Sequence, residues 1–203
     1  MRTQYPNIPF ERYADDILVH CRTEKQAKWI KARIGQRLSK CGLELHPHKT
    51  RIVYCKDDNR RQSYSDITFD YLGYTFRPRS SKNRNGQVFN SFSPAISNKA
   101  SGAMCSVMRS WRFHLRSDKS LNDLSCMSNS ILRGWINYYG HYHKSALYRV
   151  FGVFNRILVR WAIRKYKRFK FHQRWATQWL GRIATKQPQL FANWAMGIRP
   201  QAR

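Results

Sequence analysis

The first 70 residues alternate short apolar runs with turn-forming residues, a pattern typical of small β-structures. Two such runs, residues 8–13 and 17–21, flank Ala14 and Asp15. This arrangement predicts a β-hairpin that carries two adjacent acids, Asp15 and Asp16, at its tip.

A helix is expected directly after this hairpin. Thr23 and Gln26 have the spacing of a capping box, and apolar residues then recur at helical intervals until Gly42. Short apolar runs follow, with a turn at residues 46–48 and a break at Gly73. These runs predict three short strands, at residues 43–45, 51–55 and 67–76.

Beyond residue 90 the apolar residues follow helical spacing. Three helices are expected, over residues 95–115, 120–140 and 145–170. A capping box of Ser120 and Asp123 starts the second helix, and Gly140 ends it. The tail is expected to be partly helical, with turns at Gly181 and Pro188.

The third of these helices is amphipathic. One face carries apolar residues: Leu147, Val150, Phe151, Phe154, Leu158 and Trp161. Basic residues centre roughly 140° away, at about 100° per residue: Arg149, Arg156, Arg160, Arg164 and Lys167. One face should pack inward while the other offers cations to solvent or to phosphate.

The segment 77–90 is basic and rich in Ser, Asn and Gly, which favours a connection between domains. We therefore expect an α+β fold of two domains, residues 1–90 with a hairpin, a helix and short strands, and residues 91–203 with helices.

Charge changes this picture more than the rest of the composition does. The chain carries a net +27; residues 1–70 hold 14 basic and nine acidic residues, whereas residues 71–203 hold 24 and two. Such an excess favours a polyanionic partner, and the alternative is a basic protein kept in solution by its charge. No apolar run could span a membrane, and the five scattered cysteines suggest neither a disulfide framework nor a zinc site, so a cytoplasmic protein is expected.

The paired acids at the hairpin tip are the sharpest candidate for chemistry. Adjacent carboxylates raise each other's pKa, and a hard divalent cation such as Mg²⁺ relieves the repulsion. Two such ions serve phosphoryl transfer in polymerases. The alternative is a solvated acidic turn without a ligand.

Four motifs occur in an order that resembles one family: residues 10–16 (FERYADD), 42–50 (GLELHPHKT), 69–74 (FDYLGY) and 133–139 (RGWINYY). The first three are similar to the last palm motifs of the reverse transcriptases encoded by bacterial group II introns. The fourth is similar to the signature of their maturase domain, also called the thumb or domain X. The resemblance implies an incomplete palm over residues 1–90, followed by a helical maturase domain over residues 91–203.

The resemblance also implies roles for residues of the palm motifs. It makes Asp15 and Asp16 ligands of Mg²⁺ at a polymerase centre and places Lys49 near the phosphates of the incoming nucleotide. Lys49 is equally well explained as a solvated lysine. Contacts with primer or template are implied for Tyr13, Leu72, Gly73 and Tyr74, although a glycine that bends a strand explains Gly73 as well.

A further carboxylate of the family's catalytic centre lies upstream of these motifs. Only fourteen residues precede Asp15, so we expect this chain alone not to polymerise. Two functions stay open: an RNA-binding splicing cofactor, and an RNA-directed DNA polymerase that needs a separate fingers and palm segment and a DNA primer or target. An inactive relic is a third.

The maturase-like half is expected to bind group II intron RNA. Cations would contact phosphates and aromatic rings would stack on unpaired bases. The candidate RNA-binding residues are Arg133, Tyr138, Tyr139, Lys144, Arg156, Arg160, Arg164, Lys165, Lys167 and Arg168. For Trp135, core packing is favoured over base stacking, and of the two neighbouring tyrosines one should be buried and the other available.

Overall fold

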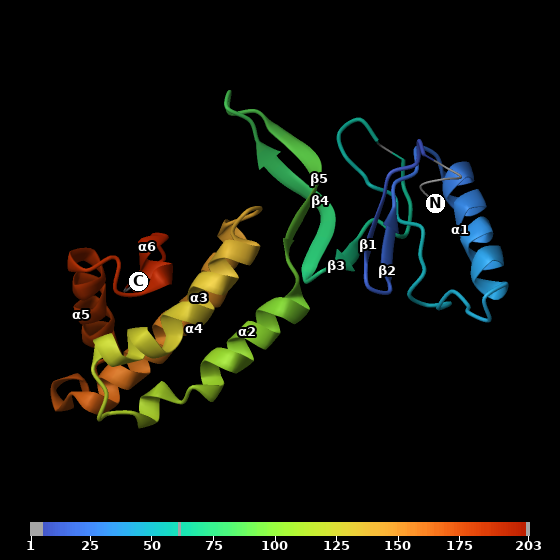
Figure 1. Cartoon of the computed structure of the whole chain (residues 1–203). Coiled ribbons are helices and arrows are strands. Elements are labelled where there is room, and N and C mark those ends of the chain that lie inside the picture. The colour runs from blue at the N-terminus through green and yellow to red at the C-terminus, as the bar shows by residue number, and fades with distance from the viewer. Residues whose placement is uncertain (1–5, 61, 202–203) are drawn as a thin grey trace. The chain divides into compact units, whose positions relative to one another are not determined.

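The computed structural model describes residues 6–60 and 62–201 of the chain. It contains two compact units, one formed by Met1–Tyr71 with Arg77–Phe92 and the other by Leu72–Phe76 with Ser93–Arg203. Small sheets and one helix belong to the first part of the chain, and helices dominate the rest (Figure 1). The predicted α+β class is confirmed.

The predicted hairpin is confirmed. Strands β1 (Phe10–Tyr13) and β2 (Asp16–Val19) pair antiparallel, with Tyr13 opposite Asp16. The connection consists of Ala14 and Asp15, and Ala14 has a left-handed φ of 52°. The Nε–H group of Arg12 donates to the carbonyl oxygen of Ala14 over 2.9 Å, which holds this tight turn.

Helix α1 (Glu24–Ser39) begins where the capping signal predicts. The hydroxyl oxygen of Thr23 accepts from the backbone N–H of Gln26. The return bond differs from a regular capping box, because Gln26 accepts from the N–H of Arg22 at 2.8 Å. Ile30 is the buried anchor of this helix.

The strands predicted at residues 43–45 and 51–55 are wrong. The described residues between α1 and β3 form no strand, although the predicted turn is present and closes through Thr50 N–H to His46 O at 3.0 Å. Tyr54 N–H donates to Asp66 O at 2.8 Å, and Tyr54 O accepts from Lys56 N–H at 3.0 Å, which is a local bond and not part of a ladder. Apolar content favours a strand only where a neighbouring strand supplies repeated backbone partners.

A second sheet has the order β3-β4-β5, from β3 (Phe69–Tyr71), β4 (Tyr74–Lys82) and β5 (Val88–Ile96). The predicted break at Gly73 is confirmed, since Leu72 and Gly73 connect β3 to β4 with φ values of 49° and 79°. Positive φ at both positions is the geometry of a two-residue type I′ hairpin turn.

The connection expected over residues 77–90 is instead a hairpin of β4 and β5. Its turn is closed by Asn83 N–H to Gln87 O at 2.9 Å and by Gln87 N–H to the side-chain oxygen of Asn83 at 2.9 Å. Further along, the hydroxyls of Ser81 and Ser91 meet across the strands at 3.0 Å. The polar composition that suggested a loop is therefore that of an exposed hairpin with an Asn-Gly-containing turn.

Helix α2 (Asn98–Ser110) starts three residues later than expected, because β5 continues through Pro94 and Ser97 caps the helix. It also ends earlier. Arg112 has a left-handed φ of 49°, which separates α2 from the 3₁₀ helix η1 (Phe113–Leu115).

Helix α3 (Leu121–Tyr139) has the predicted capping box. Ser120 N–H donates to Asp123 Oδ2 at 2.8 Å and Asp123 N–H donates to Ser120 Oγ at 3.2 Å, and Gly140 ends the helix. Helix α4 (Ser145–Lys165) is shorter than predicted. Tyr166 has an extended backbone conformation, ends α4 and directly precedes the 3₁₀ helix η2 (Lys167–Phe169).

The tail forms α5 (Gln173–Lys186) and α6 (Ala192–Ala195), with the predicted turn at Pro188. The turn predicted at Gly181 is wrong, since this residue lies inside α5. A Cβ atom there would lie 2.8 Å from the carbonyl oxygen of Pro200. The glycine is explained by close packing of α5 against the C-terminal segment.

Helix α4 forms the centre of the hydrophobic core of the second unit. All six apolar residues predicted on its inward face are buried. Asn155, also buried, joins α4 to α6: its side-chain oxygen accepts from Trp194 Nε1 at 3.0 Å and from Asn193 Nδ2 at 3.1 Å. These bonds satisfy polar groups that would otherwise be costly to bury. Within the described residues, no helix has the length and apolar character needed to cross a membrane.

Candidate nucleic-acid interface

The two acids of the β1–β2 turn are exposed, as is the neighbouring Tyr13. The hydroxyl of Tyr71 is close to this hairpin: burial raises its pKa, and the carboxylates of Glu11 and Asp16 raise it further. Extra negative charge on Tyr71 is therefore disfavoured, and its hydroxyl stays protonated beside the acids.

This turn does not form a metal centre from the described residues. Across residues 6–60 and 62–201, no three His, Cys, Asp or Glu side chains gather as a metal site. Asp15 and Asp16 supply carboxylate oxygens of the type that Mg²⁺ prefers, but two exposed acids leave most of its coordination to water. The residues present do not fit a catalytic metal site, and no reaction step follows from them.

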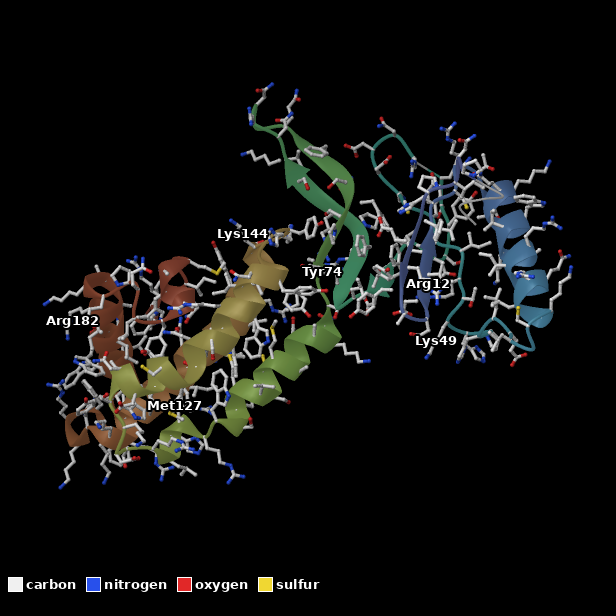
Figure 2. The ribbon with its side chains drawn as sticks, in the orientation of Figure 1. Arg12, Lys49, Tyr74, Met127, Lys144 and Arg182 are labelled. Atoms are coloured by element: carbon white, nitrogen blue, oxygen red, sulfur yellow. The ribbon has the colours of Figure 1, made fainter. Side chains whose placement is uncertain are left out.

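Lys49 projects from the turn that follows α1, and Figure 2 marks it there together with Arg12 on the hairpin. Its backbone N–H donates to His46 Nδ1 at 3.3 Å. Within the described ranges, no ion pair joins Lys49 to Asp15 or Asp16. The catalytic roles of these three residues stay predictions.

The turn at Leu72 and Gly73 packs on the end of α3, within the second unit. Tyr138 donates its hydroxyl to Leu72 O at 3.0 Å, and Ser97 N–H donates to Gly73 O at 2.9 Å. The ring of Tyr139 lies directly below the glycine: a Cβ atom at Gly73 would be 2.5 Å from its hydroxyl oxygen. Two motifs about 65 positions apart in the sequence thus form one contact site.

Tyr74 belongs to the same contact site and is only 8% exposed. Its hydroxyl donates to Tyr138 O, and its ring contacts the rings of Tyr138, Tyr139 and Tyr142 at centroid distances of 5.5, 5.2 and 5.6 Å. The pKa of Tyr74 is raised mainly by burial and to a smaller extent by the hydroxyls of the three neighbouring tyrosines. Its contacts explain Tyr74 as a structural residue, and its contact with a primer stays a prediction.

The two neighbouring tyrosines differ as expected from their positions on α3. Tyr138 is exposed and Tyr139 is half-buried. Trp135 packs against the core and stacks on Trp111, with ring centroids 6.2 Å apart, which fits the favoured core role.

The basic face of α4 reaches solvent. The exposed residues include Arg156, Arg160 and Arg164. Arg149, about two helical turns before Arg156, is exposed as well. Residues 124–203 contain no Asp or Glu at all, so no acid from this part of the chain neutralises these guanidinium groups. A row of arginines without acids is the arrangement that phosphate groups bind.

Lys165 is half-buried and differs from the exposed arginines in its contacts, whereas Arg168 is exposed on η2. The Lys165 ammonium donates to Ser117 O at 2.9 Å and to Lys119 O at 2.7 Å, and it lies 5.5 Å from the Trp161 ring. These contacts hold the chain before α3 against α4, so they account for Lys165 by structure. Lys167 is exposed on η2.

The remaining candidates, Arg133 on α3 and Lys144 before α4, are exposed. Lys144 makes no side-chain capping bond, and Figure 2 marks its position. A cation at a helix N-terminus is unfavourable because the helix dipole is positive there, so Lys144 does not owe its place to stabilising α4.

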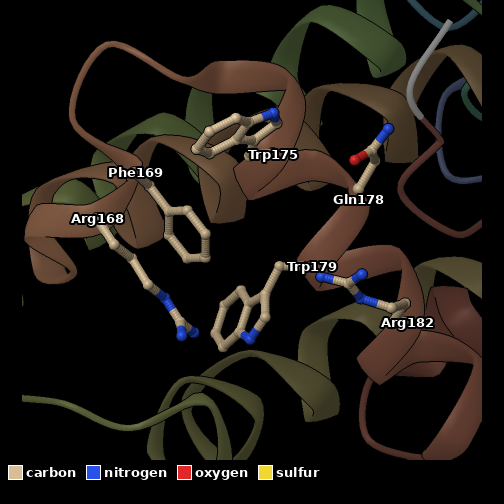
Figure 3. Close-up of a pocket in the computed structure, with 6 residues that line it drawn as sticks. All are labelled: Arg168, Phe169, Trp175, Gln178, Trp179 and Arg182. Carbon is tan, nitrogen blue, oxygen red and sulfur yellow. The ribbon is translucent and has the colours of Figure 1, made fainter.

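One group of residues on α5 was not predicted from the sequence. Trp175, Gln178, Trp179 and Arg182 line a pocket together with Arg168 and Phe169 of η2 (Figure 3). The four α5 positions follow the spacing i, i+3, i+4 and i+7, which places them on one face of a helix. Two tryptophans and an arginine on one face of a helix would have been the signal.

Comparison with protein families finds two matches that together follow the order of the motifs. Residues 1–76 match the reverse transcriptase (RNA-dependent DNA polymerase) family, and residues 103–180 match the group II intron maturase-specific domain. Searches of curated proteins and of solved structures found no significant match. The two matches show that the chain carries a C-terminal portion of a reverse transcriptase domain followed by a group II intron maturase-specific domain, which supports a maturase-type protein derived from a reverse transcriptase.

Proposed function

We propose that this protein binds group II intron RNA through the exposed arginines of α4 and so helps the RNA reach its spliceable fold. The observation that carries the proposal is the contrast between the two sides of this helix. One side is buried in the core, whereas Arg156, Arg160 and Arg164 lie exposed on the other. They follow each other at intervals of four residues, about 6 Å along the helix axis.

Phosphate contacts of this kind have a measurable signature. Each contact releases condensed counterions, so the logarithm of the binding constant falls with the logarithm of the salt concentration by about 0.7–0.9 per neutralised phosphate. Three arginines that each neutralise one phosphate account for about 2–3 units of that slope.

The test is a triple variant, R156Q/R160Q/R164Q, titrated against a group II intron transcript at several KCl concentrations. We expect weaker binding and a slope smaller by about 2–3. A matched control, K25Q/R37Q/K40Q, removes the same charge from exposed positions on α1 and just after it. Equal losses in both variants, or no loss in the first, would contradict the proposal.

The alternative function is an RNA-directed DNA polymerase completed by a separately supplied segment. The variant D15N distinguishes it, because Asp15 lies in an exposed turn of the first unit, whereas the arginines lie in the second. We expect D15N to keep both RNA affinity and the stimulation of intron splicing. Primer extension by the purified chain with Mg²⁺, lost in D15N, would instead support the polymerase.

A further inference from the structure

The pocket on α5 has a lining suited to a nucleotide. Its volume is about 320 Å³, and its walls are the rings of Phe169, Trp175 and Trp179 with Arg168, Gln178 and Arg182. Figure 3 shows the three rings gathered around the hollow, with Arg168 and Arg182 on either side of Trp179.

Contacts between rings hold Trp179 and Arg168 in the wall of this pocket. Trp179 contacts Tyr166 and Phe169 with ring centroids 5.1 and 5.4 Å apart. The guanidinium group of Arg168 lies 4.7 Å from the Phe169 ring, 5.6 Å from that of Tyr166 and 5.8 Å from that of Trp179. Stacking on rings orders Arg168, so it can bind an anion with little further loss of side-chain entropy.

The charge of the pocket selects the sign of its ligand. In the part of the chain that the structure describes, neither Arg168 nor Arg182 forms an ion pair with a carboxylate. Two unneutralised arginines repel a cation and attract a phosphate.

Exposed aromatic side chains occur at the pocket and in the segment just before α5. Trp175 is 57% exposed, and the ring of His172 stacks on it at a centroid distance of 4.4 Å. Phe171, beside it in the chain, is 89% exposed and has a left-handed φ of 66°. A positive φ strains a non-glycine residue, and an exposed ring adds no buried apolar surface. The conformation and the exposure of Phe171 are therefore not explained by the stability of the free protein.

We propose that this pocket holds one unpaired nucleotide of the RNA, an inference that rests on the proposed function and names a subsite for it. The base stacks on Trp175 and Trp179, the Gln178 amide is placed for its polar edge, and Arg168 and Arg182 bind the flanking phosphates. Small-ligand pockets begin at about 300 Å³, so the size suits a nucleotide and not a large cofactor. Bases inside a duplex are already stacked on each other, so the pocket discriminates against duplex RNA.

The experiment measures fluorescence anisotropy of the full chain with a short unstructured RNA and with an RNA duplex of the same length. We expect W175A to weaken binding of the single strand at least about fivefold, the lower end for loss of one stacked base, and to leave the duplex unaffected. W175F, which keeps a ring, should retain most of the affinity. R182Q should reduce the salt slope for the single strand by about 0.7.

Trp29 supplies the matched control. It is 47% exposed on α1 with the Arg33 guanidinium 6.0 Å from its ring, so W29A removes a similar exposed ring outside the pocket. We expect W29A to bind the single strand like the unmodified chain.

Three outcomes would overturn the inference. The first is an unchanged affinity of W175A for the single strand, and the second is an equal loss of affinity for the duplex. The third comes from a parallel binding measurement with phosphatidylglycerol vesicles: if W175A loses affinity for the vesicles alone, the exposed rings belong to a membrane-binding surface. Failure of the proposed function gives a different result, because the unmodified chain would then bind neither the short single-stranded RNA nor the intron transcript.

Discussion

Replacement of Gly73 by alanine tests the contact between the β3–β4 turn and α3. The change has two costs. Gly73 has a φ of 79°, where a Cβ atom costs about 1–2 kcal/mol. The new Cβ would also lie 2.5 Å from the Tyr139 hydroxyl, 0.9 Å short of the 3.4 Å at which ordinary contact begins. Relief of this overlap displaces the turn and weakens its two hydrogen bonds, each contributing about 1 kcal/mol.

The sum is a destabilisation of about 3 kcal/mol for G73A. The control G197A lies in the same unit, and Gly197 has a φ of 87° with no atom within 4 Å of the place a Cβ would occupy, so it carries only the backbone cost. For a chain of this size we expect melting temperatures lower by about 6–12 °C for G73A and by about 2–8 °C for G197A. Circular dichroism and urea unfolding measure both.

A second substitution identifies the steric part of the cost. Y139F removes the hydroxyl oxygen and leaves the ring carbon at 3.4 Å as the nearest neighbour of the new Cβ. G73A should therefore be less destabilising in a Y139F background, with a coupling energy of about 1 kcal/mol or more in the double-mutant cycle. Equal effects of G73A and G197A, or a coupling energy near zero, would refute the reasoning.

Two further predictions concern α3. L132A should cost about 3–5 kcal/mol in urea unfolding because Leu132 is fully buried, whereas I131A next to it, at 37% exposure, should cost little; similar losses would contradict the assigned helix face. Hydrogen bonds from Ser120 lower the pKa of Asp123, so its contribution to stability is present above the usual Asp pKa and lost as the pH falls through the lowered value. D123N should flatten this part of the stability curve, and an unchanged pH dependence would argue against the capping box.

The features that the sequence predicted correctly depend on neighbouring residues or on a regular period. The hairpin around Ala14 and Asp15 follows from two flanking apolar runs. The capping box of Ser120 and Asp123 needs only four residues. The apolar stripe of α4 repeats over about four turns, so a deviation at a single position does not change which face of the helix is apolar.

The errors arise where distant parts of the chain decide the outcome. The polar segment 77–90 forms strands because two stretches pair across the turn at Asn83, which local composition does not show. Gly181 stays helical because the carbonyl of Pro200 approaches it, not because the chain bends. In both cases the deciding partner lies outside the window of residues from which a pattern is inferred.

The candidate site divides in the same way. The exposure of the α4 arginines follows from helical periodicity. The burial of Tyr74 does not, because its partners on α3 are more than sixty positions away. The α5 pocket combines two helices of different type, and only the spacing of Trp175, Trp179 and Arg182 was visible beforehand.

The contacts of Tyr74 bear on where the maturase-like unit begins. The reverse transcriptase match ends at residue 76, yet Leu72–Phe76 belongs to the same compact unit as the helices. There the ring of Tyr74 packs among three tyrosines, and two hydrogen bonds hold the turn before it. A chain that began after residue 76 would lack the Tyr74 ring that packs on half-buried Tyr139, and the Tyr138 hydroxyl, the Tyr138 carbonyl and Ser97 N–H would lose these partners. The helical maturase-like unit is thus built partly from residues of the reverse transcriptase match, and packing within this unit explains Leu72, Gly73 and Tyr74 without a primer.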